Sequence, residues 1–123
     1  MNKTFFSFAG LFIFVAAGMD LNYNTYSDTE VVDLSSASTC NDFLDYPNKH
    51  YGAASGFLGN NLTICGGANK TMAMDMCYTY DMYAQDGWMQ LCTMNIRRVN
   101  HAIAKFPNGS LWITGRVMIH AIL

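Results

Sequence analysis

The chain has 123 residues, of which 51% are hydrophobic and 13% are charged, and its formal net charge is −2. This length allows at most one compact domain with a small core. The slight negative charge excludes a nucleic-acid binder that works by bulk attraction, because neutralising phosphates requires clustered Lys and Arg.

The N-terminal segment has the pattern of a secretory signal peptide. Lys3 gives a positive start, Phe5–Ala17 is interrupted only by one Ser and one Gly, and Ala16–Gly18 forms a small-residue cleavage site. This apolar run is shorter than the ~20 residues that span a membrane. We therefore expect a signal helix over 1–18 and a mature, secreted chain that begins near Met19 and does not contact the membrane. A buried helix of the fold and an uncleaved anchor are the alternatives.

After a linker over residues 19–28, the rest of the chain is expected to form strands. No later stretch shows a helical period of 3.6 residues with caps. The apolar and aromatic segments are short and are bounded by turn residues, such as Asp86-Gly87. The predicted strands of the best-defined unit are 51–58, 62–66, 76–82 and 88–94.

The chain repeats itself with a period of nearly fifty residues. At an offset of 49, Ala53, Leu62, Ile64 and Gly66 recur as Ala102, Leu111, Ile113 and Gly115. A weaker copy at an offset of 48 places Thr29–Leu34 over Cys77–Met82, with Asp33 over Asp81. A period of this length with four short strands is typical of a propeller blade.

The order of residues within the period resembles the Kelch repeat. The matching residues, in chain order, are Gly66, Gly67, Tyr80, Asp81, Trp88, Met94, Arg97 or Arg98, and Gly115. The Cys-Gly-Gly at Cys65 and the Cys-Tyr at Cys77 are similar to extracellular members of this family. The resemblance spans about Thr29 to Arg116, and Arg116 departs from it because a second glycine is expected there.

This resemblance implies an all-β protein made of antiparallel propeller blades after the signal helix. It divides the chain into a partial blade of two outer strands, one full Kelch blade, the start of the next blade and a non-repeat tail, over residues 29–46, 47–98, 99–116 and 117–123. A propeller needs at least about four blades to close, so the chain is expected to be a piece of a larger disc or a subunit that assembles. The motif residues are expected to be structural.

The four cysteines are interpreted as disulfide-forming, because an even number in a secreted chain favours crosslinks. A zinc site is disfavoured, since no CxxC occurs and the histidines lie far from the cysteines along the chain. The blade arrangement implies a Cys65–Cys77 disulfide between neighbouring strands. The pairing of Cys40 and Cys92 stays open.

Three glycosylation sequons follow the signal segment, at Asn61, Asn69 and Asn108. The charges are also unevenly distributed. Asp20 to Asp45 holds acids and no base, whereas the chain from Arg97 onward holds bases and no acid. These ends would meet in a closed ring, where their charges would be complementary.

The expected function is that of a secreted Kelch-type scaffold that binds an extracellular protein or glycan, without catalysis or cofactor. The loop Ala68–Asp75 is the candidate binding loop. One alternative is a fragment of an extracellular enzyme similar to galactose oxidase, which uses copper. The other is a small, independent disulfide-bonded secreted protein that self-associates through its open sheet edges.

Overall fold

The computed structural model describes residues 5–9, 12–35, 38–40, 44–81, 84 and 86–117. In these ranges the chain is all-β, as expected, and has no helix long and apolar enough to cross a membrane. The ten strands are β1 (Phe5–Ala9), β2 (Phe12–Met19), β3 (Thr25–Asp33), β4 (Ser38–Cys40), β5 (Ala54–Leu58), β6 (Asn61–Cys65), β7 (Met76–Asp81), β8 (Trp88–Thr93), β9 (Arg98–Lys105) and β10 (Leu111–Val117).

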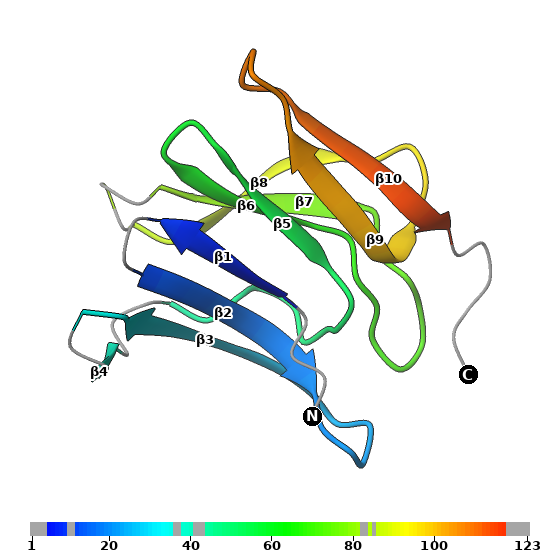
Figure 1. The fold of residues 1–123 in the computed structure, drawn as a ribbon. Helices are drawn as coiled ribbons and strands as arrows, with labels where there is room; N and C mark the ends of the chain where they lie inside the picture. Colours follow the sequence, from blue (N-terminus) through cyan, green and yellow to red (C-terminus); the bar gives the residue numbers. More distant parts are fainter. Residues whose placement is uncertain are drawn as a thin grey trace.

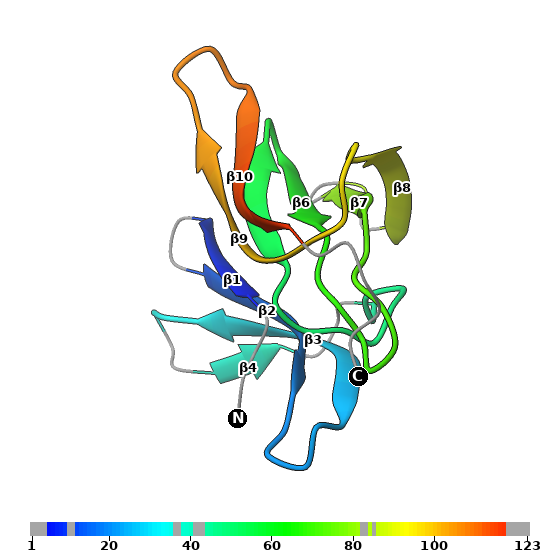
Figure 2. The same ribbon diagram turned by 90° about the vertical axis from the view of Figure 1, so that its right-hand side faces the viewer.

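The described strands form three antiparallel sheets. The first sheet has the order β1-β2-β3-β4, the second β5-β6-β7-β8, and the third consists of β9 and β10. Figures 1 and 2 show the second sheet between the other two, with β5 lying next to both β1 and β9. Each sheet therefore presents one face to its neighbour, and the two end sheets each have a second, outward face.

The described residues of the N-terminal segment, where a signal helix is expected, are strands. Residues 5–9 and 12–19 are strands, and β2 pairs with β1 on one side and β3 on the other. Phe, Val and Ile are strand-favouring residues, and Phe14 and Ala16 of this run are buried in the core. Within the expected partial blade over 29–46, β3 and β4 are two strands of a four-stranded sheet that also contains β1 and β2.

The first two sheets have the same register. Ala16 pairs with Thr29 as Cys65 pairs with Cys77. Phe12 pairs with Asp33 as Asn61 pairs with Asp81, so β2 precedes β6 by 49 residues and β3 precedes β7 by 48. The repeat therefore extends into the segment that the sequence analysis assigned to the signal.

A left-handed backbone marks the same place in all three sheets. Ala17, Gly66 and Gly115 are spaced 49 residues apart and have φ angles of 60°, 73° and 116°. At Gly66 an added Cβ would lie 2.7 Å from the Arg98 carbonyl oxygen and 2.7 Å from the His101 ring. Glycine is required there both for the dihedral angle and for the close approach of two sheets.

The core lies between the first and second sheets. Its buried members come from both, and Phe14 of β2 meets Phe57 of β5 edge to face with ring centroids 6.3 Å apart. The core cluster consists of Phe14, Ala16, Val31, Tyr46, Ala53, Leu62, Ile64 and Tyr80. The opposite face of the second sheet packs on the third, where Ile103 and Leu111 approach Gly56.

Candidate binding site on the open face of the first sheet

A cavity of about 180 Å³ lies on the outward face of the first sheet. It is lined by apolar or small residues of β2 and by alternate residues of β3, namely Val15, Ala17, Gly18, Met19, Tyr26, Asp28 and Glu30. Side chains alternate between the faces of a strand. Glu30 pairs with Val15, so both point away from the core face that holds the neighbouring pair Phe14 and Val31.

The turn between β2 and β3 fixes one wall of this cavity. The two carboxylate oxygens of Asp20 accept hydrogen bonds from the backbone N–H groups of Asn22 and Asn24, the Asn24 amide and the Tyr26 hydroxyl, at 2.8 to 3.0 Å. Several hydrogen-bond donors lower the pKa of Asp20 to about 2, and the Tyr26 hydroxyl has the largest effect. Tyr26 is thus oriented by a carboxylate that stays ionised at neutral pH.

The arrangement places hydrogen-bond acceptors beside an apolar floor. Asp28 and Glu30 carry the carboxylates, Tyr26 adds an aromatic ring, and Val15 and Met19 supply apolar surface. Carboxylates accept hydrogen bonds from hydroxyl or ammonium groups, and an aromatic face packs on C–H groups or cations. The cavity therefore suits a polyhydroxylated or positively charged ligand.

The aromatic residues of the sequence motif lie between the first and second sheets. Tyr80 is buried, and its ring centroid is 5.3 Å from that of Trp88. Tyr46 packs edge to face on Trp88 at 5.0 Å, and the Trp88 indole N–H donates to the Leu44 carbonyl at 3.0 Å. Asp81 accepts a hydrogen bond from the Ala84 backbone N–H. These contacts are structural.

The glycine and arginine positions of the motif join the second sheet to the third. Gly67 donates its backbone N–H to the Arg98 carbonyl at 2.9 Å, and the Arg98 guanidinium donates to the Gly115 carbonyl at 2.9 Å. Arg98 thus joins the second sheet to the third through its backbone carbonyl, whereas its guanidinium links β9 to β10 within the third sheet, and Arg97 is exposed. Met94 approaches the same junction at Gly66.

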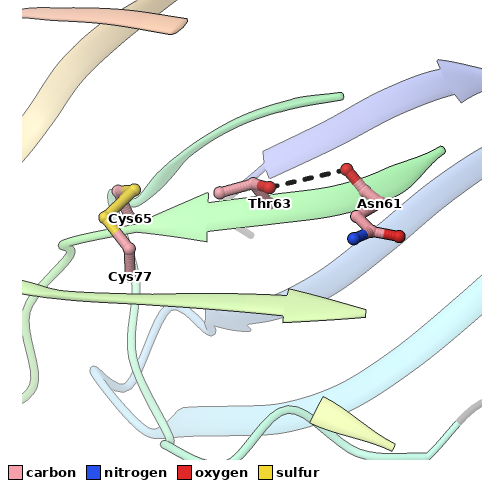
Figure 3. The surroundings of a disulfide bond; sticks show 4 residues. All are labelled: Asn61, Thr63, Cys65 and Cys77. Carbon is pink, nitrogen blue, oxygen red and sulfur yellow. Dashed lines mark hydrogen bonds between the residues drawn. A yellow bond between two sulfur atoms is a disulfide. The ribbon is translucent and has the colours of Figure 1, made fainter. Parts of the chain in front are cut away.

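The disulfide between Cys65 and Cys77 is present, with a sulfur–sulfur distance of 2.04 Å (Figure 3). It joins the end of β6 to the start of β7 and is buried. Cys92, on β8, is an exposed free thiol. Cys40 ends β4 in the other four-stranded sheet, and its side chain lies outside the described residues.

The three sequon asparagines have different surroundings. Asn61 begins β6, and the Thr63 hydroxyl of its sequon is buried and bonded to the Asn61 carbonyl (Figure 3). Asn69 is half-buried and its side-chain oxygen accepts from Thr71, whereas Asn108 is exposed at the turn between β9 and β10. Asn108 is therefore the most accessible of the three acceptors.

The predicted binding loop over Ala68–Asp75 is held at both ends. Ala68 and Ala73 are buried, and Met74 donates its backbone N–H to the Gly67 carbonyl at 2.8 Å. Its exposed tip is confined to residues 70–72. In the part of the chain that the structure describes, no group of three or more His, Cys, Asp or Glu side chains is placed to hold a metal ion.

The sequence does not indicate the cavity, because three of its seven lining residues belong to the segment with the pattern of a signal peptide. The available signal was the alternation of Tyr26, Asp28 and Glu30, which places three polar or aromatic side chains on one face of a strand. Tyr26 and Asp28 fall within the linker expected over residues 19–28, where no strand is predicted.

Comparison with known proteins identifies a solved structure of similar fold but no family to which the chain belongs. No family model and no curated protein matches the chain. The solved structure of YjhT is similar, with a TM-score of 0.74 and 17% sequence identity over 94% of this chain. The match covers 34% of the YjhT chain, so this sequence spans about a third of that structure.

Proposed function

We propose that the chain is a part of a Kelch-type β-propeller, made of two blades and the first two strands of a third. The observation that carries this proposal is the shared register of the two four-stranded sheets, with a left-handed residue at the same position of each. Face-to-face stacking of such sheets is how propeller blades pack. The resemblance in the motif residues supports the same assignment.

Within this architecture the chain acts as a binding scaffold in an oxidising, extracellular compartment. The buried Cys65–Cys77 disulfide is compatible with that location, since such bonds persist where thiols are not kept reduced. Asn108, Asn69 and Asn61 are the proposed glycan acceptors. The partner is an extracellular protein or glycan, and it docks on the cavity of the first sheet when no further blade or second copy of the chain covers that face.

The binding proposal is tested with a variant that keeps the cavity's shape and removes its charge. Asp28→Asn with Glu30→Gln is compared with the wild-type chain on immobilised glycans and on basic peptides. We expect at least a tenfold loss of affinity for whichever class binds, because two hydrogen-bond acceptors lose their charge. Asp45→Asn, an exposed carboxylate outside the cavity lining, is the matched control. Equal binding by the double variant and the wild type would overturn the assignment of the cavity.

The alternative is a fragment of a copper-dependent enzyme similar to galactose oxidase. Purified chain is loaded with copper and assayed for a copper-dependent absorbance band and for alcohol oxidation. Turnover that disappears on copper removal would replace the scaffold proposal with the enzymatic one.

A further inference from the structure

Three cysteines lie in one row across the second sheet. Cys65 of β6 is directly opposite Cys77 of β7, and Cys77 is in turn opposite Cys92 of β8. Residues that pair across antiparallel strands project from the same face of the sheet. The disulfide therefore has a thiol beside it, on the far side of β7 from Cys65.

The two ends of this row differ in their access to solvent. Cys65 and Cys77 are each 2% exposed, whereas Cys92 is exposed and unpaired. The neighbouring residues Met89 and Leu91 are 61% and 45% exposed, so this end of β8 is open. An external reagent thus reaches Cys92 first, and the disulfide is reached through it.

The order of the row favours nucleophilic displacement. Thiol–disulfide exchange needs the attacking thiolate to approach a disulfide sulfur opposite the bond that breaks. Cys92, Cys77 and Cys65 occupy three adjacent strands in that order, so a Cys92 thiolate would attack Cys77 from the side of β7 away from Cys65. Direct attack on Cys65 is disfavoured because two strand spacings, roughly 10 Å, separate it from Cys92.

Both pairs occupy opposed positions of neighbouring strands. The Cα atoms of Cys65 and Cys77 are 4.1 Å apart, and opposed residues such as Cys77 and Cys92 generally have Cα atoms about 4.5–5.5 Å apart, which a disulfide can bridge. The register shift between β7 and β8 puts Tyr78 opposite Gln90 and Cys77 opposite Cys92, which leaves Leu91 as the extra residue of a bulge. The strands do not need to separate for the partner of Cys77 to change.

We propose that Cys92, Cys77 and Cys65 form a thiol–disulfide exchange site. Cys92 loses its proton to solvent, and its thiolate forms a bond to the Cys77 sulfur while the Cys77–Cys65 bond breaks. The electron pair of that bond leaves on Cys65, which then takes up a proton, so no oxidant or reductant is consumed. The exchange moves the free thiol from the open surface of β8 to the buried end of β6, beside Gly66 and His101.

The test maps the disulfides of the folded chain in a Cys40→Ser background. The protein is incubated at pH 8.5, alkylated with N-ethylmaleimide, and cleaved without reduction at Lys, Arg and Asp, since Asp81 and Asp86 separate Cys77 from Cys92. Mass spectrometry is expected to find both the Cys65–Cys77 and the Cys77–Cys92 linkage. The amount of alkylated Cys65 should equal the amount of the Cys77–Cys92 linkage, because forming that bond frees Cys65. Incubation at pH 5 before alkylation should suppress the exchange at least tenfold, because the thiolate is the nucleophile.

Two variants make the result decisive. Cys65→Ser is expected to form the Cys77–Cys92 bond on mild oxidation while circular dichroism shows an unchanged sheet signal. Cys92→Ser with Gln90→Cys keeps a thiol on β8 but opposite Tyr78, on the other face of the sheet, and should give no bond to Cys77. The proposal fails if the chain that keeps Cys65, Cys77 and Cys92 yields only the Cys65–Cys77 linkage after prolonged incubation. It also fails if Cys77 and Cys92 both remain alkylatable in the Cys65→Ser variant after mild oxidation.

Discussion

His50 is a fully buried titratable residue. Its side chain is 0% exposed and stacks on Tyr46 with ring centroids 4.5 Å apart. Its backbone carbonyl accepts from Gly18 at 2.9 Å, so the residue also joins the end of β2 to the segment before β5. Burial lowers the pKa of His50 to about 4 from its usual 6.5. The neutral imidazole is therefore part of the core.

We expect this burial to make stability depend on pH. The pKa of His50 is lower in the folded state than in the unfolded state. Its contribution to the free energy of unfolding is therefore complete above pH 6.5 and is lost as the pH falls from 6.5 toward 4. Between pH 8 and pH 5 the loss from His50 is about 2 kcal/mol. Urea unfolding of the wild type and of His50→Phe, which keeps a ring against Tyr46, measures it. As the pH is lowered, the free energy of unfolding should fall more steeply for the wild type than for His50→Phe. Parallel pH profiles of the two proteins would show that His50 is not responsible.

At the scale of elements, β2 is the strand on which the first sheet depends. It pairs with β1 and β3, and Phe14 and Ala16 are 3% and 0% exposed. A cleaved signal segment would take this strand away from the sheet. Folding and processing of residues 1–18 therefore make opposite predictions about substitutions there.

We expect Ala16→Glu to destabilise the protein by more than about 3 kcal/mol, because a carboxylate would be buried in the core without a partner. Leu21→Glu, at an 85% exposed position in the next turn, is the control and should change stability little. The measurement is thermal unfolding of the chain purified from an exporting host, with its intact mass to locate the N-terminus. A mature chain that begins near Met19 and unfolds identically in both variants would support the signal-peptide interpretation and contradict a structural role of β2 in the mature protein.

The comparison of β2 with β6 shows what the sequence can predict. The Cys65–Cys77 pairing and the positions of β5 to β8 followed from the repeat, because polar turns and glycines bound those strands. The same repeat was hidden at β2, where Ala17 stands in place of glycine and the run is apolar throughout. Periodicity alone does not separate a short buried strand from a helix. The cavity could not be predicted from the sequence because β2, one of the two strands that line it, was not predicted.

The whole molecule has two unlike ends. The first sheet ends the stack with the cavity that holds Asp28 and Glu30. The third sheet ends it with Trp112, which is 60% exposed and whose ring centroid is 4.4 Å from that of Phe106. Acids predominate before residue 46 and bases from Arg97 onward. The two ends are complementary in charge, and a contact between unlike surfaces is of the head-to-tail type that forms rings or filaments.

We therefore expect the isolated chain to associate head to tail through these two faces. Light scattering should show association at 50 mM salt that weakens severalfold at 500 mM, because exposed charges more than a Debye length apart are screened. Trp112→Glu adds a carboxylate to the face that meets the acidic cavity, and it should keep the chain monomeric at both salt concentrations. Met72→Glu, at the exposed tip of the loop before β7, is the control and should associate like the wild type. Association that is indifferent to Trp112 and to salt would instead indicate pairing through the open edge of β10, which in the described residues pairs only with β9.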